Sequence, residues 1–455
     1  MGTSNLTKDS PDISAGRLDL SEYAINFDDA VPPLNPQTAH VEANRCYFCY
    51  DAPCMNACPT GIDIPGFIKK IATGNLTGAA VRILEQNVLG GSCARDCPTE
   101  ILCEQACVRK AEGENPITIG SLQRYAMDNG LEGMPHPFSR AETTGKRVAV
   151  VGGGPAGLAC AHRLAMLGHD VTIFEAREKL GGLNEYGVAE YKLANGFAAR
   201  EVAFIMEIGG IDVKLGTALG RDVTLADLRS EYDAVFLGLG LGAVKALDCE
   251  GEVLEGVYNA VDYIASIRQA DDFASLPIGR RIVIIGGGNT AIDIAVQAKR
   301  LGAEDVTLVY RRGAEAMSAT DHEQEFAQTN GVTIKYWSRP LRIEGVNGHV
   351  TAAVFERTAL DKSGKLVGTG LEFTIEADMV FKAIGQNFVA DPLKDGSQSV
   401  LELENGRIKA DDEGRTSIEG VWAGGDCVAG GQDLTVESVQ AGKLAAHSID
   451  RALRK

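Results

Sequence analysis

Apolar and polar positions along the chain follow a pattern that predicts two copies of one βαβ unit. In the first copy, an apolar run at residues 147–151 leads through a glycine-rich turn into a helix expected to end at Leu167, and a second apolar run covers residues 171–174. In the second copy the two apolar runs lie at residues 281–285 and 306–310. Short apolar runs that alternate with helices are typical of parallel sheets in α/β proteins.

Three further segments complete this arrangement. Residues 234–240 and 379–386 each form an apolar run that ends in small residues, and we expect the chain to pass between the two copies there. Residues 434–449 carry apolar side chains at the spacing of a helix. The pattern therefore predicts an α/β fold with two Rossmann-like modules, the second inserted in the first between Gly240 and Gly385.

The glycine-rich turn of the first copy indicates a nucleotide site. Gly152, Gly154 and Gly157 stand in the order G-x-G-x-x-G between the strand and the helix, which allows a pyrophosphate to approach the helix N-terminus. Glu175 ends the second strand, where a carboxylate can accept a hydrogen bond from a ribose 2′-hydroxyl. An ordinary glycine-rich turn is the alternative, but the strand, the helix and the acid all stand in the required order.

The second copy differs where the acid is expected. Gly286, Gly288 and Ala291 repeat the turn, yet Arg311 and Arg312 follow the second strand in place of a carboxylate. Guanidinium groups at this point suit a 2′-phosphate, which predicts NADP(H) as the nucleotide. A solvated basic turn is the alternative.

Eight of the 11 cysteines lie together before the first copy, in the patterns C-x2-C-x4-C-x3-C-P and C-x3-C-P-x4-C-x3-C. They are Cys46, Cys49, Cys54, Cys58, Cys93, Cys97, Cys103 and Cys107. Disulfides are disfavoured in a reducing compartment, and the irregular spacings fit zinc sites poorly. Iron–sulfur clusters are favoured, and a proline after Cys58 and Cys97 resembles the ferredoxin pattern.

Residues 64–87, between the two cysteine groups, predict two short helices. We therefore expect a helical metal-binding domain over residues 1–140 that ends in a proline-containing linker at residues 134–140. The predicted domains are then the helical domain at 1–140, a first part of the first nucleotide module at 141–245, the second nucleotide module at 246–384 and a second part of the first module at 385–455.

Composition narrows the possible functions. The 455 residues include 62 Asp and Glu against 44 Lys and Arg, a net charge of −18 that argues against a nucleic-acid-binding surface. The 53 glycines show no collagen period and indicate many tight turns. Neither a signal peptide nor a long uninterrupted apolar run is apparent, so we expect a cytoplasmic protein.

With these motifs in place, the chain resembles the flavin-dependent pyridine-nucleotide oxidoreductases. The cysteine groups narrow the resemblance to the electron-input subunits of dihydropyrimidine dehydrogenases. The small subunits of glutamate synthase share the architecture, but their second cysteine group is usually shorter than the CPTEILC found here.

The resemblance implies the following site residues. One 4Fe-4S cluster would be held by Cys46, Cys49, Cys54 and Cys107, and the other by Cys58, Cys97, Cys103 and the amide of Gln123, which leaves Cys93 without a role. FAD contacts would involve Gly152, Gly154, Pro155, Ala156, Gly157, Glu175, Gly182, Leu183, Lys192, Gly425, Asp426 and Thr435. Nicotinamide-nucleotide contacts would involve Gly286, Gly288, Asn289, Thr290, Ala291, Arg311, Arg312 and Gly385. Two residues depart from the family: Lys192 replaces a frequent Arg, and Ser318 replaces a third phosphate-binding Arg.

The resemblance also implies a function. The chain would pass electrons from NAD(P)H through FAD and two 4Fe-4S clusters to an FMN-containing, pyrimidine-reducing partner subunit in a hetero-oligomer. No side chain is expected to act as a catalytic acid or base, since the cofactors carry the chemistry. The alternatives are a glutamate synthase small subunit and a redox sensor. A disulfide reductase is disfavoured, because Cys160, Cys249 and Cys427 form no C-x-x-C pair.

Overall fold

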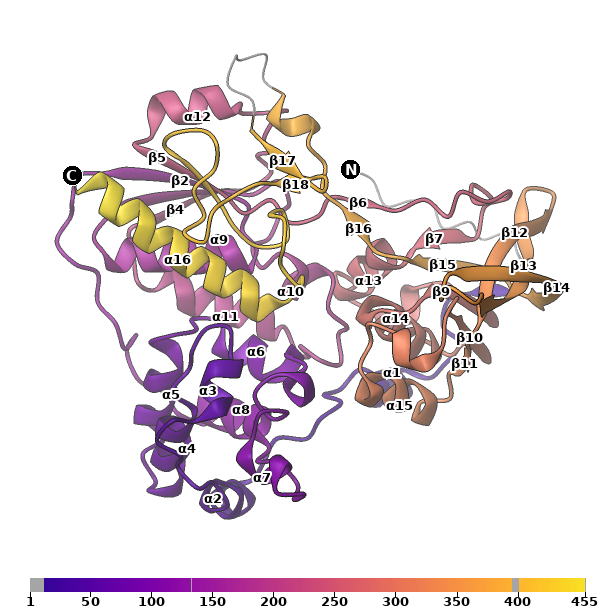
Figure 1. Cartoon of the computed structure of the whole chain (residues 1–455), viewed down its shortest axis with the longest axis horizontal. Helices are drawn as coiled ribbons and strands as arrows, with labels where there is room; N and C mark the ends of the chain where they lie inside the picture. The colour runs from indigo at the N-terminus through magenta and orange to yellow at the C-terminus, as the bar shows by residue number, and fades with distance from the viewer. Residues whose placement is uncertain (1–11, 132, 395–400, 455) are drawn as a thin grey trace. The chain divides into compact units, whose positions relative to one another are not determined.

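The computed structural model describes residues 12–131, 133–394 and 401–454, which belong to two compact units (Figure 1). Unit 1 comprises Met1–Ala30, Tyr186–Asn195 and Val244–Gln386, and unit 2 comprises Val31–Glu185, Gly196–Ala243 and Asn387–Lys455. The chain passes between the units near β6 (Ala243–Val244) and β16 (Gln386–Asn387). The predicted first domain starts at residue 1, but residues 1–11 lie outside the described residues.

A five-stranded parallel sheet forms one half of unit 2. Its strand order is β19-β5-β2-β3-β4. The strands are β2 (Arg147–Val151), β3 (Asp170–Phe174), β4 (Ile211–Lys214), β5 (Ala234–Leu237) and β19 (Val421–Ala423). The last strand of the sheet, β19, follows residues 244–386 in the chain and pairs with β5.

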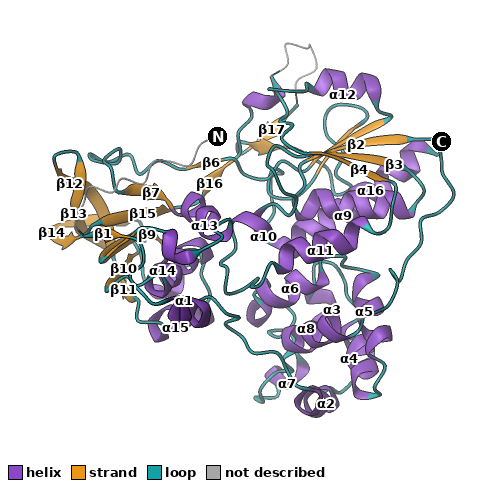
Figure 2. Cartoon of the chain, turned by 180° about the vertical axis from the view of Figure 1, so that it is seen from behind, coloured by secondary structure: helices purple, strands orange, loops and turns teal. Residues whose placement is uncertain are grey.

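Helices cover this sheet of unit 2, as Figure 2 shows for α9, α11 and α16. They are α9 (Pro155–Met166), α10 (Leu183–Tyr186), α11 (Phe197–Met206), α12 (Leu225–Glu231) and α16 (Thr435–Leu453), and a short hairpin pairs β17 (Leu403–Glu404) with β18 (Arg407–Ile408). α16 packs directly on α9, since a Cβ at Gly442 would lie 2.1 Å from the carbonyl oxygen of Ala156. Only glycine permits the two helices to approach this closely.

The other half of unit 2 is a small helical domain with its own apolar core. Its helices are α2 (Pro36–Asn44), α3 (Pro53–Ala57), α4 (Ile64–Ala72), α5 (Leu76–Leu84), α6 (Gly90–Asp96), the 3-10 helix η1 (Thr99–Ile101), α7 (Val108–Ala111) and α8 (Ile119–Asn129). Phe67, Ile68, Ile83 and Leu122 are fully buried in this core. The two short helices predicted at residues 64–87 are confirmed as α4 and α5.

Unit 1 contains a second five-stranded parallel sheet in the order β11-β10-β9-β15-β7. Its strands are β7 (Val257–Asn259), β9 (Arg281–Gly286), β10 (Asp305–Val309), β11 (Thr333–Lys335) and β15 (Met379–Ala383). The helices of the unit are α1 (Leu20–Asn26), α13 (Ala260–Arg268), α14 (Asn289–Arg300) and α15 (Asp321–Thr329), with the 3-10 turns η2 (Phe273–Ser275) and η3 (Ala314–Ala316). An antiparallel sheet joins β12 (Ser338–Val346), β13 (His349–Leu360) and β14 (Leu366–Glu376).

Residues 12–30 pack in unit 1 and not in the helical domain, where the predicted boundary at residue 140 would place them. β1 (Ile13–Ser14) pairs with β8 (Ile278–Gly279), and Tyr23 and Phe27 of α1 are buried in the core of unit 1. The apolar residues of this segment are too few to show from sequence alone which core they join.

The predicted fold class is confirmed: the structure has a helical domain and two Rossmann-like modules, and the strands of the first module lie on both sides of the second along the chain. Among the described helices, none is both long and apolar enough to cross a membrane.

Candidate functional site

The turn after β2 has the backbone geometry that a dinucleotide-binding loop requires. Gly152 has a φ of +102°, and a Cβ there would lie 2.2 Å from the carbonyl oxygen of Gly238. A Cβ at Gly157 would lie 1.9 Å from the carbonyl oxygen of Gly152. A Cβ at Gly154, the N-cap of α9, would meet only the Cα of Gly182 at 3.5 Å. Any side chain would therefore disrupt the turn at two of these positions, while Gly154 leaves room beside the helix N-terminus for a phosphate.

Glu175 lies beside this turn, directly after β3. Its Oε2 accepts a hydrogen bond from the N–H of Gly153 at 2.7 Å, and its Oε1 accepts one from the N–H of Arg177 at 2.8 Å. The residue is buried, and its bond with Gly153 is shielded from water. The carboxylate thus fixes the glycine-rich turn, and each oxygen keeps a lone pair that can accept from a ribose hydroxyl.

Asp426 follows β19 in the loop that leads to α16. Its Oδ1 accepts a hydrogen bond from the hydroxyl of Ser438 at 3.0 Å, and burial, followed by the charge of Asp433, raises its pKa. Gly425, Asp426, Ser438 and Gln440 line a cavity of about 320 Å³. Oε1 of Gln440 is buried and has no hydrogen-bond partner among the described residues. The loop therefore offers polar groups that a bound ligand would satisfy.

Thr435 and Leu183 lie at the starts of α16 and α10. The hydroxyl of Thr435 donates a hydrogen bond to Oδ1 of Asn184 at 3.0 Å, which ties the two helix starts together. The predicted FAD residues between Gly152 and Leu183, together with Gly425, Asp426 and Thr435, all belong to unit 2.

Lys192 is the exception among the predicted FAD residues, because it belongs to unit 1. Its Nζ lies 2.9 Å from Oδ1 of Asp293 on α14 and 2.8 Å from Oε1 of Glu323 on α15. All three side chains are largely buried. In this structure the cation of Lys192 is neutralised within the second module, and its contact with FAD stays a prediction.

The second glycine-rich turn, in unit 1, repeats the geometry of the first. A Cβ at Gly286 would lie 2.2 Å from the carbonyl oxygen of Ala383, and Gly288 is the N-cap of α14. Asn289 is the first residue of that helix, and its buried Oδ1 has no hydrogen-bond partner in the described part of the chain. Gly385, which follows β15, has a φ of +95°. A nucleotide hydroxyl or amide would satisfy the amide oxygen of Asn289.

Arg311 and Arg312 follow β10 at the end where a ribose-binding acid would stand. Both are exposed, and within the described residues neither guanidinium forms an ion pair. Two other arginines of unit 1 are neutralised, Arg281 by Asp378 and Arg339 by Glu356. Ser318 lies beside the turn, with its hydroxyl 3.4 Å from the carbonyl oxygen of Gly287. The two free cations are available to a phosphate group.

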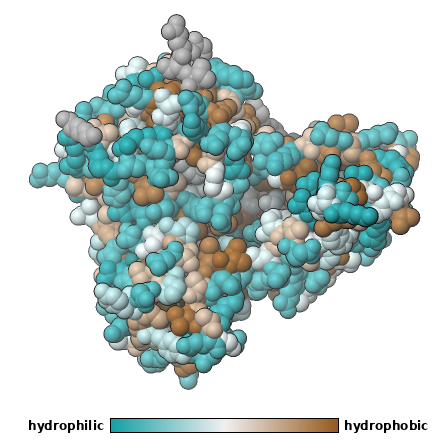
Figure 3. Space-filling view, in the orientation of Figure 1, coloured by the Kyte–Doolittle hydropathy of each residue, from teal (hydrophilic) through white to brown (hydrophobic). Residues whose placement is uncertain are grey.

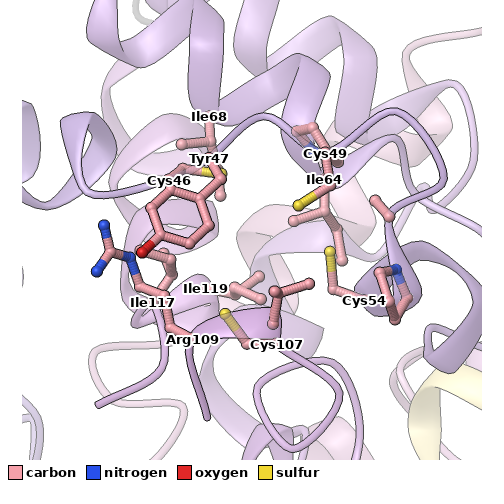
Figure 4. Close-up of a pocket in the computed structure, with 14 residues that line it drawn as sticks. Cys46, Tyr47, Cys49, Cys54, Ile64, Ile68, Cys107, Arg109, Ile117 and Ile119 are labelled. Carbon is pink, nitrogen blue, oxygen red and sulfur yellow. The ribbon is translucent and has the colours of Figure 1, made fainter. Parts of the chain in front are cut away.

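Four of the predicted cluster ligands surround one small cavity in unit 2. Cys46, Cys49, Cys54 and Cys107 line a space of about 30 Å³ with an apolar wall that includes Ile64, Ile68, Ile117 and Ile119. Figure 4 shows the sulfur atoms of Cys49, Cys54 and Cys107 directed toward the space between them. Each iron of a 4Fe-4S cluster takes one thiolate, so thiols placed around a cavity are the arrangement that such a cluster needs.

Burial and the charges of neighbouring thiols raise the pKa values of several predicted ligands, and Cys54 of the first set acts on Cys103 of the second. Burial, with smaller effects from Cys46, Cys107 and Cys49, raises the pKa of Cys54 to about 12. Burial also raises the pKa of Cys103, where Cys58 is among the neighbours that contribute. Buried thiols resist ionisation in the absence of a nearby positive charge, and the iron of a cluster supplies that charge.

Cys97 and Gln123 extend the second set. A hydrogen bond with Cys93, followed by burial, raises the pKa of Cys97 well above its usual range, and Cys103 contributes as well. Cys93, which the sequence left without a role, is therefore a direct neighbour of a predicted ligand. Gln123 is buried on α8, and its Nε2 donates to the carbonyl oxygen of Gly90 at 2.7 Å. That bond uses the amide nitrogen, so the amide oxygen would be the ligand atom if Gln123 binds a cluster as predicted.

Among the described residues, no three His, Cys, Asp or Glu side chains are arranged to hold a single metal ion. Of the eight ligands that the resemblance implies, four thiols line one cavity, and the grouping of Cys58, Cys97, Cys103 and Gln123 stays a prediction.

Glu201 of α11 is a buried site residue that the sequence did not reveal. Its Oε1 accepts hydrogen bonds from the N–H groups of Gly91 at 2.8 Å and Ser92 at 3.1 Å, and the hydroxyl of Ser92 donates to Oε2. Burial raises its pKa to about 7 against the opposing effect of these bonds. The carboxyl group ties α11 of the first module to α6, the helix that leads to Cys97. In the sequence Glu201 is an ordinary acidic residue of an amphipathic helix, and no motif around it indicates a contact with α6.

Two family models match the chain. Residues 146–442 match the model of the pyridine nucleotide-disulphide oxidoreductase family. Residues 23–134 match the model described as dihydropyrimidine dehydrogenase domain II, 4Fe-4S cluster.

Two groups of relatives resemble almost the whole chain. The glutamate synthase (NADPH) small chain of Escherichia coli is 35% identical, over 93% of this chain and 93% of that protein. The NAD-dependent dihydropyrimidine dehydrogenase subunit PreT of Salmonella typhimurium is 34% identical, over 94% of this chain and 98% of that protein.

Solved structures share the fold of the two modules. FprA of Mycobacterium tuberculosis, solved in complex with NADPH, has a TM-score of 0.55 at 20% identity, over 68% of this chain and 85% of that chain. Thioredoxin reductase of T. acidophilum has a TM-score of 0.53 at 21% identity, over 68% of this chain and 100% of that chain.

Proposed function

Because the chain belongs to the pyridine nucleotide-disulphide oxidoreductase family and carries an iron–sulfur domain of the dihydropyrimidine dehydrogenase type, we propose that it is the electron-input subunit of a dihydropyrimidine dehydrogenase. It is an NAD(P)-dependent iron–sulfur flavoprotein. The proposal adds two 4Fe-4S clusters and a partner subunit that contains FMN and reduces uracil or thymine.

The observation that carries the proposal is the presence, in one compact unit, of the first glycine-rich turn and both cysteine groups. When bound, FAD accepts a hydride as an electron pair, and iron–sulfur clusters accept electrons one at a time. The residues of the chain have positioning roles. Glu175 fixes the turn around Gly153, and Glu201 fixes α6 against α11.

A partner subunit is proposed because the described residues are fully used by the helical domain and the two modules. A pyrimidine-binding domain such as a barrel of ~250 residues has no place among them. The helical domain also carries exposed aromatic side chains next to the first cysteine set: Tyr50 is fully exposed and Tyr47 is half exposed. Figure 3 shows hydrophobic patches on an otherwise hydrophilic surface. Exposed aromatic residues are enriched at protein interfaces.

The second candidate is a glutamate synthase small subunit, since those relatives are as similar in sequence as the pyrimidine enzymes. The feature that favours the pyrimidine enzyme is the five-residue spacing between Cys97 and Cys103, which accommodates the 3-10 turn Thr99–Ile101. The glutamate synthase subunits usually have a shorter spacing at this point.

Reconstitution tests the proposal. The purified chain, prepared without oxygen, is expected to contain about eight iron and eight labile sulfide atoms, because two sets of four ligands are available. It is expected to oxidise NAD(P)H with artificial acceptors but to produce no dihydrouracil from uracil alone. Addition of the FMN-containing partner should start dihydrouracil formation.

Three results would contradict this proposal. Stoichiometric zinc without labile sulfide would remove the clusters, and dihydrouracil formation by the chain alone would remove the need for a partner. Turnover of glutamine and 2-oxoglutarate with a glutamate synthase large subunit, and none of uracil with the pyrimidine partner, would select the second candidate.

A further inference from the structure

A buried lysine lies between the first module and the helical domain inside unit 2. Lys443 is near the middle of α16, the last helix of the module, and its side chain is only 9% exposed. Its Nζ donates to three oxygens of the helical domain: the carbonyl oxygen of Thr60 at 2.8 Å, and the carbonyl oxygen and Oε1 of Gln86, each at 3.0 Å. The ammonium group therefore uses all three of its donors.

The three oxygens belong to neutral groups, so they solvate the charge without cancelling it. Within the described residues Lys443 forms no salt bridge with a carboxylate. Arg163 of α9 lies close enough to repel it and donates to the carbonyl oxygen of Glu85 at 2.8 Å. Burial and then Arg163 lower the pKa of Lys443 to about 8, while Cys58 acts in the opposite direction. A buried cation without an anionic partner is unfavourable. A negative charge placed near Lys443 would therefore be stabilised.

Cys58 supplies that negative charge when it holds a cluster. Thr60, the residue that Lys443 binds, follows Cys58 by two positions, and its hydroxyl lies 3.3 Å from the sulfur atom of Cys58. A cluster with thiolate ligands is negatively charged, and reduction adds one further negative charge. Net charge around a cluster is one of the factors that set its reduction potential.

We propose that Lys443 is a positioning residue that raises the reduction potential of the cluster held by Cys58, Cys97, Cys103 and Gln123, and so favours electron transfer from the flavin to that cluster. The inference rests on the proposed function, because it requires the second cluster. Lys443 stabilises the reduced cluster more than the oxidised one, since the reduced cluster carries the extra electron. The electron comes from the flavin that NAD(P)H reduces.

Potentiometric titration of the full-length protein, prepared without oxygen and followed by EPR, tests this proposal. Lys443→Gln removes the charge and keeps a donor for Thr60. We expect the variant to lower the equilibrium constant for reduction of one cluster at least tenfold, equivalent to ~59 mV for a one-electron couple. The potential of the other cluster should change less. Lys443→Arg, which keeps the charge, should retain the wild-type potential.

Two further variants make the test decisive. Arg451→Gln removes a positive charge from the exposed part of α16, where Arg451 contacts Glu413, and should leave both potentials unchanged. Gln86→Glu keeps Lys443 in place but puts a carboxylate beside its Nζ, so it should lower the same potential as Lys443→Gln. Gln86→Glu gives the result if Lys443→Gln fails to retain its clusters.

The outcomes separate this inference from the proposed function. Absence of iron and labile sulfide from the wild-type protein would overturn both. If the wild-type protein holds two clusters and the potentials do not respond to Lys443→Gln or to Gln86→Glu, Lys443 only connects α16 with the α5 region, and the inference is wrong.

Discussion

Removal of the two exposed arginines after β10 should change the nucleotide preference of the protein. Arg311 and Arg312 follow β10, where the predicted NADP(H) site would place its 2′-phosphate, and within the described residues no carboxylate pairs with either guanidinium. We therefore expect the wild-type protein to prefer NADPH to NADH. Arg311→Gln and Arg312→Gln should each weaken this preference, because NADH lacks the phosphate that the cations would bind.

The size of the effect follows from the exposure of the two side chains. A hydrogen bond to a charged group contributes ~1.5 to 3 kcal/mol, and solvent screening at an exposed site favours the lower end of that range. A loss of ~1.4 kcal/mol is a tenfold change. Each single variant should therefore reduce kcat/KM for NADPH about tenfold and the double variant up to about a hundredfold, whereas kcat/KM for NADH should stay nearly constant.

The assay is stopped-flow reduction of the bound flavin by each nucleotide, at fixed ionic strength. Arg339→Gln is the matched control, since Arg339 is a partly exposed arginine of the same unit that pairs with Glu356. An equal loss with NADPH and NADH in the double variant would show that the arginines only shape the turn. Equal kcat/KM values in the wild-type protein would show that they point into solvent.

Three other predictions concern unit 2. Gln123→Ala should damage one cluster but leave FAD bound and reducible, and EPR signals from two intact clusters would return Gln123 to a structural role. Gly157→Ala should abolish FAD retention, because its Cβ would lie 1.9 Å from the carbonyl oxygen of Gly152; flavin content after gel filtration is the measurement, and full occupancy would refute the close approach. Burial raises the pKa of Glu201 to about 7 in the folded protein. Between the ordinary pKa of Glu and 7, the folded state therefore holds a proton that the unfolded state has lost, so the free energy of unfolding falls as pH rises toward and through 7. Urea unfolding should show a loss of ~1 kcal/mol between pH 6 and pH 8 that Glu201→Gln removes, and an unchanged slope in that variant would contradict the assignment.

The sequence revealed the parts of the fold that depend on local pattern. The strand at residues 147–151, the turn through Gly157 and the periodic helix at the C-terminus are recognisable because glycine spacing and apolar periodicity are local properties. The predicted helix end at Leu167 agrees with α9, which ends at Met166 with Leu167 as its C-cap. Candidate site residues that follow a strand end, such as Glu175 and Arg311, are predicted by the same reasoning, and the structure places both directly after their strands.

Contacts between distant segments could not be predicted in this way. Glu201 binds backbone groups more than a hundred residues away, and Lys443 binds groups more than three hundred residues away. Nothing in the sequence around either residue distinguishes it from an ordinary surface charge. Residues 12–30 show the same limit, because Tyr23 and Phe27 suit any apolar core, and only tertiary packing decides that they join unit 1.

The pairing of β19 with β5 has a consequence for the order in which the protein folds during synthesis. The sheet of unit 1 needs no strand beyond Ala383, so it can close before the C-terminal segment leaves the ribosome. The sheet of unit 2 must wait for Val421–Ala423, and its cover on α9 must wait for α16. Domains generally fold as units in the order of their completion. The inserted module therefore matures before the first module, and during that interval the exposed edge of β5 and the uncovered face of α9 are the surfaces that need protection from aggregation.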